Sequence, residues 1–135
     1  MTGESLEGLR LFLVEDEALV AMLLEDMLSD LGCVVIDIAG SLSQALDRLD
    51  SLDATADGAI LDVNLGGEQV YPFADALAER RIPFIFATGY GRMGVAARYP
   101  TAPVLAKPYG STELATALQT LRRPAAGRAE QRRRG

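Results

Sequence analysis

Ala59-Ile60-Leu61-Asp62-Val63-Asn64-Leu65-Gly66-Gly67 is a short apolar run that ends at an aspartate and continues into a turn. The run 59–61 is typical of a buried strand, because it is short, wholly apolar and bounded by turn residues. Asp62 is therefore predicted to close a strand. In a parallel α/β sheet, ligands bind just beyond the carboxyl ends of the strands. Asp62 is accordingly expected at a functional site.

Three other apolar runs end in the same way, each with a polar group directly after it. Glu15-Asp16 follow residues 11–14, Thr88-Gly89 follow residues 84–87, and Lys107-Pro108 follow residues 104–106. Lys107 is the only lysine in the chain. Each signal alone has an ordinary structural explanation, such as an acidic helix start or a loop opening. Together they would bring a carboxylate pair, an aspartate, a hydroxyl and an ammonium to one edge of a sheet.

The rest of the chain alternates between predicted strands and helices. We expect strands at residues 9–14, 34–38, 59–61, 82–87 and 103–106, and helices at residues 17–31, 41–49, 71–79, 90–99 and 114–121. Ser41 and Gln44 have the spacing of a capping box, and Pro72 is tolerated in a first helical turn. Five strands that alternate with five helices predict a doubly wound α/β sheet.

Length, composition and charge fit a single globular domain. The chain has 135 residues, of which 49% are hydrophobic. Residues 1–121 carry 18 acidic and 7 basic side chains, whereas residues 122–135 carry six arginines and one glutamate. An acidic body argues against nucleic-acid binding, and the arginine-rich end is expected to be a disordered tail. No apolar run is long enough to predict a membrane span, and the single cysteine, Cys33, fits a reducing cytoplasm.

The four strand-end signals resemble those of the receiver domain of two-component response regulators. The resemblance covers about residues 8–122 and leaves an N-terminal extension at residues 1–7 and the arginine-rich tail at residues 123–135. It implies a flavodoxin-like fold, in which five parallel strands lie in the order 2-1-3-4-5 among five helices.

In that family the aspartate after the third strand takes a phosphoryl group from a histidine kinase, which gives this role to Asp62. The resemblance also implies a Mg²⁺ ion, a cation that prefers oxygen ligands, held by Glu15, Asp16, Asp62 and the backbone carbonyl of Asn64. Thr88 would contact one phosphoryl oxygen and Lys107 another. The Lys107–Pro108 bond is expected to be cis, as in receivers.

Phe86-Ala87-Thr88-Gly89-Tyr90 resembles the Phe-Ala-Thr-Gly-x-Tyr motif of a narrower type of receiver. That type is found largely as single-domain regulators and in hybrid kinases, and several members act in general stress signalling. Most receivers carry a switch aromatic three residues before the lysine, where this chain has Val104. Tyr90, two residues after Thr88, is the candidate to replace it, moving together with the fourth helix region.

The resemblance implies a sensor histidine kinase or phosphotransfer protein as the phosphoryl donor. No effector domain is expected after the last helix, so the output would be a protein contact, a phosphate sink or a relay. If Val20, Leu23, Leu24, Met27 and Leu31 face the sheet, Leu19 and Met22 point outward beside the acidic site. That exposed pair would suit docking of a kinase, and exposed apolar residues without a role remain an equal alternative.

Other functions stay open at this point. An aspartyl-phosphate hydrolase of the haloacid dehalogenase type needs an acid two residues after its nucleophile, where this chain has Asn64. A phosphorylation-independent adaptor typically lacks the acidic pair, the aspartate or the lysine, and all are present. A receiver segment of a hybrid kinase is a further alternative. We expect a cytoplasmic regulator that catalyses only its own phosphorylation and dephosphorylation, and hence not an enzyme that turns over a substrate.

Overall fold

A parallel five-stranded sheet forms the centre of the molecule in the computed structural model, which describes residues 5–89 and 93–121. The strands lie in the order β2-β1-β3-β6-β7 and all pairs are parallel. Their bounds are β1 Arg10–Val14, β2 Val34–Ala39, β3 Gly58–Asp62, β6 Phe84–Thr88 and β7 Val104–Ala106. Across the sheet, the order β2-β1-β3-β6-β7 corresponds to the second, first, third, fourth and fifth of the expected strands, so the predicted fold class and strand order are confirmed.

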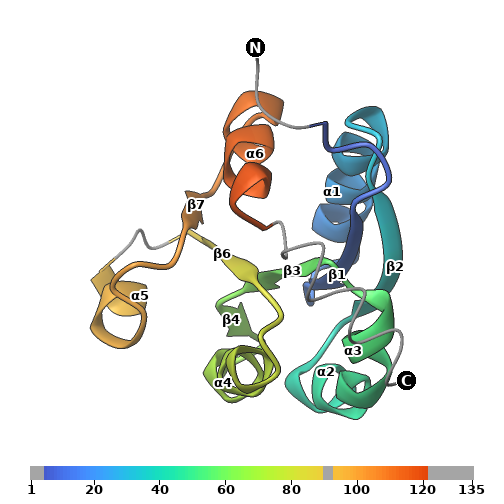
Figure 1. Ribbon diagram of the computed structural model, residues 1–135. Helices are drawn as coiled ribbons and strands as arrows, with labels where there is room; N and C mark the ends of the chain where they lie inside the picture. The colour runs from blue at the N-terminus through green and yellow to red at the C-terminus, as the bar shows by residue number, and fades with distance from the viewer. Residues whose placement is uncertain (1–4, 90–92, 122–135) are drawn as a thin grey trace.

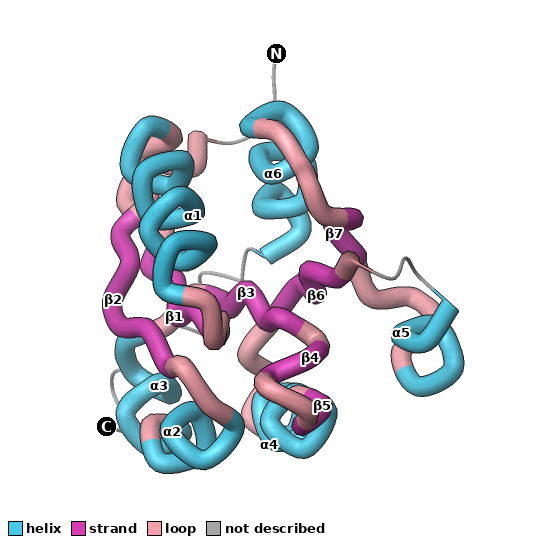
Figure 2. Tube along the Cα trace, turned by 180° about the vertical axis from the view of Figure 1, so that it is seen from behind, coloured by secondary structure: helices cyan, strands magenta, loops and turns pink. Residues whose placement is uncertain are grey.

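Helices cover both faces of the sheet (Figure 1, Figure 2). On one face lie α1 (Ala18–Asp30) and α6 (Ser111–Leu118), and α6 continues into a 3-10 turn (Gln119–Leu121). On the other lie α2 (Leu42–Asp47), α3 (Leu49–Thr55) and α4 (Tyr71–Glu79). Helix α5 (Met93–Arg98) lies farther out, on the side of the edge strand β7. None of the helices within the described ranges combines the length and the apolar character that a membrane span requires.

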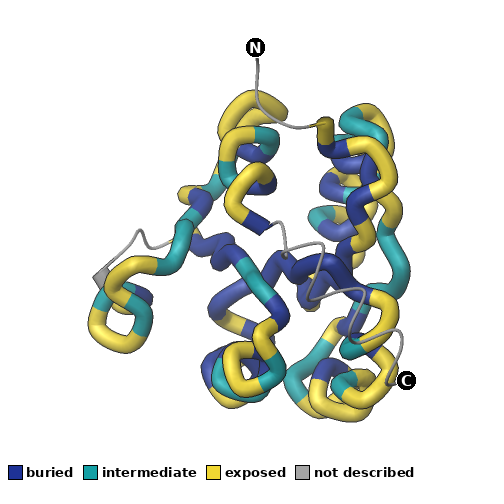
Figure 3. The backbone as a smooth tube through the Cα atoms, in the orientation of Figure 1, coloured by how far each residue is buried: buried dark blue, intermediate teal, exposed yellow. Residues whose placement is uncertain are grey.

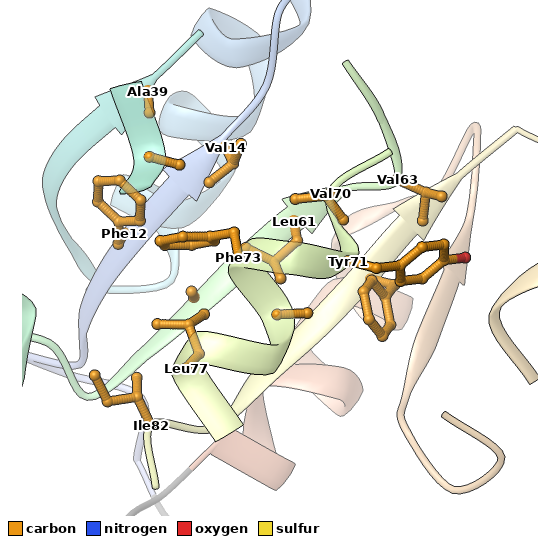
Figure 4. Packing of buried hydrophobic residues seen from close by; sticks show 14 of the residues in the cluster. Phe12, Val14, Ala39, Leu61, Val63, Val70, Tyr71, Phe73, Leu77 and Ile82 are labelled. Carbon is orange, nitrogen blue, oxygen red and sulfur yellow. The ribbon is translucent and has the colours of Figure 1, made fainter. Parts of the chain in front are cut away.

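The two faces of the sheet bury two separate apolar cores, because successive strand side chains point to opposite faces. Leu11 and Leu13 of β1 pack toward α1 and α6, while Phe12 and Val14 pack toward the other helices. The central strands are buried along nearly all of their length, whereas the helices alternate buried and exposed residues (Figure 3). In the larger core Phe73 of α4 packs on Phe12, with ring centroids 5.6 Å apart (Figure 4).

The helix expected over residues 41–49 is interrupted. It forms two short helices, α2 and α3, with a turn at Arg48 whose side chain pairs with Asp37 on β2. The predicted N-cap is present, since the Ser41 hydroxyl accepts a hydrogen bond from the Gln44 amide at 3.1 Å. The structure therefore has six helices in the described residues where five were expected.

A small hairpin occupies the segment that was expected to be a simple turn. Its strands are β4 (Asn64–Leu65) and β5 (Glu68–Gln69), which pair antiparallel. Gly66 and Gly67 at its tip have φ angles of +59° and +96°, in the left-handed region that favours glycine. A two-residue glycine turn of this kind suits the twist of an antiparallel hairpin.

The exposed face of α1 is wider than expected. Leu19 is 74% exposed and Met22 is 59% exposed, as predicted, but Leu23 was expected to face the sheet and is 65% exposed. Only Ala21, Leu24 and Leu28 of this helix are buried. The expectation for Leu23 is wrong because α1 presents a narrow stripe to the sheet, which leaves Leu23 at the side of the contact.

Candidate functional site

The parallel strand pairing brings the four predicted strand ends to one edge of the sheet. Val14 pairs with Leu61 across β1 and β3, which places Glu15 beside Asp62. Asp62 pairs with Ala87, and Thr88 pairs with Ala106, directly before Lys107. The local reason is the same in each case: an apolar strand is held in the sheet up to its carboxyl end, and the polar residue lies at or directly after the last position of the strand.

Three carboxylates form the centre of this site. Glu15, Asp16 and Asp62 each offer an oxygen, and these oxygens lie within 4.8 Å of one another. Glu15 and Asp62 are buried and Asp16 is exposed, so the group opens to solvent on one side. One oxygen of Glu15 accepts a hydrogen bond from the Glu17 amide at 3.1 Å, which fixes that side chain. A cluster of carboxylate oxygens fits a hard divalent cation such as Mg²⁺.

Lys107 lies between two of these acids. Its Nζ is 3.1 Å from Oε1 of Glu15 and 3.3 Å from Oδ1 of Asp62. Burial alone would lower the pKa of Lys107, but the hydrogen bond to Glu15 and the charges of both acids outweigh it and raise that pKa. The side chain is thus held as an ammonium directly beside Asp62. The Lys107–Pro108 bond is cis, as expected.

The electrostatic balance at Asp62 favours its protonated form. Burial and the neighbouring charge of Glu15 raise the pKa of Asp62 from 3.8 to about 7, although Lys107 acts in the opposite direction. One lysine therefore does not compensate two buried carboxylates. A cation between the acids would supply the missing positive charge and keep Asp62 ionised.

Thr88 is buried at the end of β6, and its backbone carbonyl accepts a hydrogen bond from the Lys107 amide at 2.9 Å. It lies on the wall of a cleft of about 400 Å³, which is also lined by Val63, Asn64, Gly67, Gln69, Tyr71, Gly94 and Val95. Asn64 is exposed, and its side-chain oxygen accepts a hydrogen bond from the Gly67 amide at 3.1 Å. The role of its backbone carbonyl stays a prediction. Tyr90 lies outside the described residues.

Two features at the site were not predicted. Tyr109 follows the Lys-Pro pair and lines an apolar cleft of about 350 Å³ between α1 and the loop after β7. Burial raises the pKa of Tyr109, and its ring lines the same cleft as Lys107. The second feature is the β4–β5 hairpin, whose Gly66 lies next to Asp16. The adjacent glycines 66 and 67 were the available sequence signal for it.

Comparisons with known proteins agree with this geometry. A family model, the response regulator receiver domain, matches residues 11–119. The solution structure of SdrG from Sphingomonas melonis Fr1 is 44% identical with a TM-score of 0.73, covering 87% of this chain and 98% of that chain. The BeF3-activated conformation of SdrG from Pseudomonas melonis Fr1 is 43% identical with a TM-score of 0.71, covering 84% and 98%.

A more distant similarity is to the response regulator PhyR from Brucella abortus, at 25% identity and a TM-score of 0.73. That match covers 84% of this chain but 47% of PhyR. No curated protein sequence gives a significant match. Because the family model spans most of the chain and the site residues lie together at the edge where the fold places them, this chain belongs to the response regulator receiver domain family.

Proposed function

We propose that the chain is a single-domain response regulator that accepts a phosphoryl group on Asp62 from a histidine kinase or a phosphotransfer protein. The observation that carries the proposal is the placement of Asp62, whose carboxylate lies within 4.8 Å of those of Glu15 and Asp16 and 3.3 Å from the Lys107 ammonium. Phosphoryl transfer needs a cation site and a fixed positive charge, which the neighbouring acids and Lys107 would supply. A surface aspartate without this role requires neither.

The transfer is an in-line displacement at phosphorus. An oxygen of Asp62 forms the new P–O bond as the phosphorus–nitrogen bond of the donor histidine breaks, and the product is an acyl phosphate. Glu15, Asp16, Asp62 and the Asn64 carbonyl would hold Mg²⁺, which supplies charge neutralisation for the phosphoryl oxygens. Lys107 neutralises a second phosphoryl oxygen through its ammonium, and the Thr88 hydroxyl donates a hydrogen bond to another. Thr88 and Tyr90 are the proposed switch residues.

The exposed face of α1 is the proposed docking surface for the phosphoryl donor. Leu19, Met22 and Leu23 are exposed there, beside the apolar cleft that Val20, Met27 and Tyr109 line. Because Lys107 lines the same cleft, a partner bound to it would be held next to Asp62. An amphipathic helix that presents apolar side chains would fit this surface.

We place the protein in the cytoplasm, as a regulator that acts through protein contacts or as a phosphate sink or relay, in stress signalling. The activated conformation known for SdrG, which is 43% identical, supports a phosphoryl-dependent change of state. The chain would catalyse only its own phosphorylation and dephosphorylation.

Intact-mass spectrometry tests the acceptor. Wild type and Asp62→Ala are incubated with Mg²⁺ and a small phosphodonor such as acetyl phosphate. We expect one phosphoryl adduct on wild type, none on the variant, and none when EDTA is added first. A folded wild type that forms no adduct with small donors or with kinase would favour a phosphorylation-independent adaptor and reject the proposal.

Charge substitutions test the docking surface. Leu19→Glu and Met22→Glu should slow transfer from the kinase and leave phosphorylation by acetyl phosphate intact. Leu46→Glu is the matched control, because Leu46 is an exposed leucine on α2, in the helical layer on the opposite face of the sheet. Equal loss with both donors in the α1 variants would show damage to the site and contradict a docking role.

A further inference from the structure

The helices on the α1 side of the sheet carry acidic residues without cations beside them. Residues 5–34 contain seven acidic side chains and one basic side chain, Arg10. Neither α1 nor α6 contains a lysine or an arginine. The opposite helical layer differs, because Arg80 at the end of α4 pairs with Asp50 and Asp53 of α3. The α1 side therefore lacks the internal charge balance of the other layer.

Three acids lie at the carboxyl end of α1. Asp30 is the last residue of the helix, Asp26 lies about one turn before it, and both are exposed. The Glu7 carboxylate lies against Gly32, just beyond the helix. Within the described residues none of these three acids belongs to an ion pair. A helix carries partial negative charge at its carboxyl end, and the last turn of α1 holds no basic residue to offset it.

Apolar side chains adjoin these acids on the same helix. Leu23 is 65% exposed and precedes Asp26 by three residues, so the two are neighbours on the helix surface. Met27 precedes Asp30 by the same spacing, and Leu23 and Met27 line the apolar cleft beside Tyr109. Arginine suits a surface of this kind, because its methylene stem packs on apolar groups while its guanidinium pairs with carboxylates.

The chain itself supplies arginines near this surface. Leu121, the last described residue, packs against Gly58, where β3 begins, and α1 ends shortly before Val34, where β2 begins. Both helical ends therefore lie at the edge where the strands start. Residues 122–135 follow outside the described part and carry six arginines and one glutamate. Fourteen extended residues span about 46 Å, whereas α1 rises about 10 Å over residues 23–30, so the segment is long enough to reach the exposed face of α1.

We propose that the arginine-rich segment 122–135 binds its own domain at the carboxyl end of α1, where it covers Leu23 and competes with the phosphoryl donor. The competition rests on the proposed function, because it concerns the same docking surface. An arginine paired with Asp26 lies beside Leu23, so the segment and a helix of the donor exclude one another there. Its covalent attachment keeps the segment at a high local concentration, as in other intramolecular contacts.

A nitroxide label within the segment tests where it binds. Ala129→Cys carries the label in the full chain, and Cys33→Ala removes the other thiol. We expect the label to broaden the NMR amide signals of residues 23–33 and to leave those of α2, α3 and α4 sharp. Salt at about 1 M should remove the broadening, because the screening length then falls to about 3 Å.

Charge substitutions on α1 show whether the acids hold the segment. Asp26→Asn combined with Asp30→Asn should abolish the broadening. Asp47→Asn combined with Glu79→Gln is the matched control, since it removes the same charge from exposed acids on α2 and α4. The control should broaden like the unsubstituted surface. Broadening that is spread evenly over the molecule, or that survives the two substitutions on α1, would overturn the proposal.

Phosphotransfer rates test the competition. The combined variant Arg132→Gln, Arg133→Gln, Arg134→Gln should accept phosphoryl groups from the kinase about threefold to tenfold faster, because it frees the docking surface. Phosphorylation by acetyl phosphate should be unchanged. A transfer rate no higher than that of wild type would overturn the competition. A wild type that accepts no phosphoryl group would instead reject the proposed function, and the label would still decide whether the segment binds α1.

Discussion

Replacing Asp62 by asparagine is expected to stabilise the folded protein when no divalent cation is present. The pKa of Asp62 is raised from 3.8 to about 7 by burial and by Glu15, so the folded state holds this proton more tightly than the unfolded chain does. As the pH rises between these values, the unfolded chain releases its proton first. The free energy of unfolding therefore falls through that window and stays lowered above it. Asparagine does not titrate, which removes the penalty.

The magnitude follows from the size of the shift. A rise from 3.8 to about 7, at about 1.36 kcal/mol per pKa unit, sets an upper limit of about 4 kcal/mol above the folded pKa. Asp16 beside it is exposed and Lys107 is only half-buried, so water reaches the site and screens its charges. After this discount we expect Asp62→Asn to be more stable than wild type by about 2 kcal/mol. At about pH 4 the difference should nearly vanish.

Urea unfolding in EDTA, followed by far-ultraviolet circular dichroism because the chain has no tryptophan, measures this difference. Mg²⁺ at ten times its dissociation constant should then stabilise wild type by about 1.4 kcal/mol. It should stabilise Asp62→Asn less, because that variant has lost a ligand. An Asp62→Asn protein no more stable than wild type at about pH 8 in EDTA would refute the electrostatic account of the site.

Three further substitutions test other parts of the structure. Gly58→Ala should destabilise the protein by about 1–2 kcal/mol in urea unfolding, because the added Cβ would lie 3.1 Å from the Pro83 carbonyl oxygen and 3.2 Å from Leu121. Leu77→Ala should cost about 2–5 kcal/mol in the same assay, since Leu77 is fully buried. Tyr99→Phe should weaken the loss of stability at alkaline pH. The pKa of Tyr99 in the folded protein is about 12, so the unfolded chain loses this proton first and the stability of wild type falls as the pH rises toward that value.

The strand ends of the site were predictable because their signals are local. Asp62, Thr88 and Lys107 each lie at the end of an apolar run, and the carboxyl ends of parallel strands meet at one edge of the sheet. These two facts place the three residues together without knowledge of any long-range contact. The same holds for the N-cap at Ser41, where donor and acceptor are three residues apart. These predictions were confirmed by the fold.

The features that were missed depend on partners far apart in sequence. The break at Arg48 is accompanied by an ion pair with Asp37, and the exposure of Leu23 depends on how α1 meets the sheet. The Tyr99 hydroxyl, directly after α5, donates a hydrogen bond to Asp75, which precedes it by 24 residues and lies on α4. Such contacts leave no periodic signal in the sequence.

The buried carboxylate of Asp62 lowers the stability of the fold, and the surrounding strands are rigid enough to hold it in place. The residues that precede the site, Val14, Leu61 and Ala87, are almost fully buried and paired across the sheet, so they hold Glu15 and Asp62 together against their repulsion. Because these strands are rigid, the repulsion between the two acids is relieved by binding a proton or a cation more readily than by a movement of the backbone. Helix α5 is less constrained, because only Val95 is buried among its residues whose burial is described.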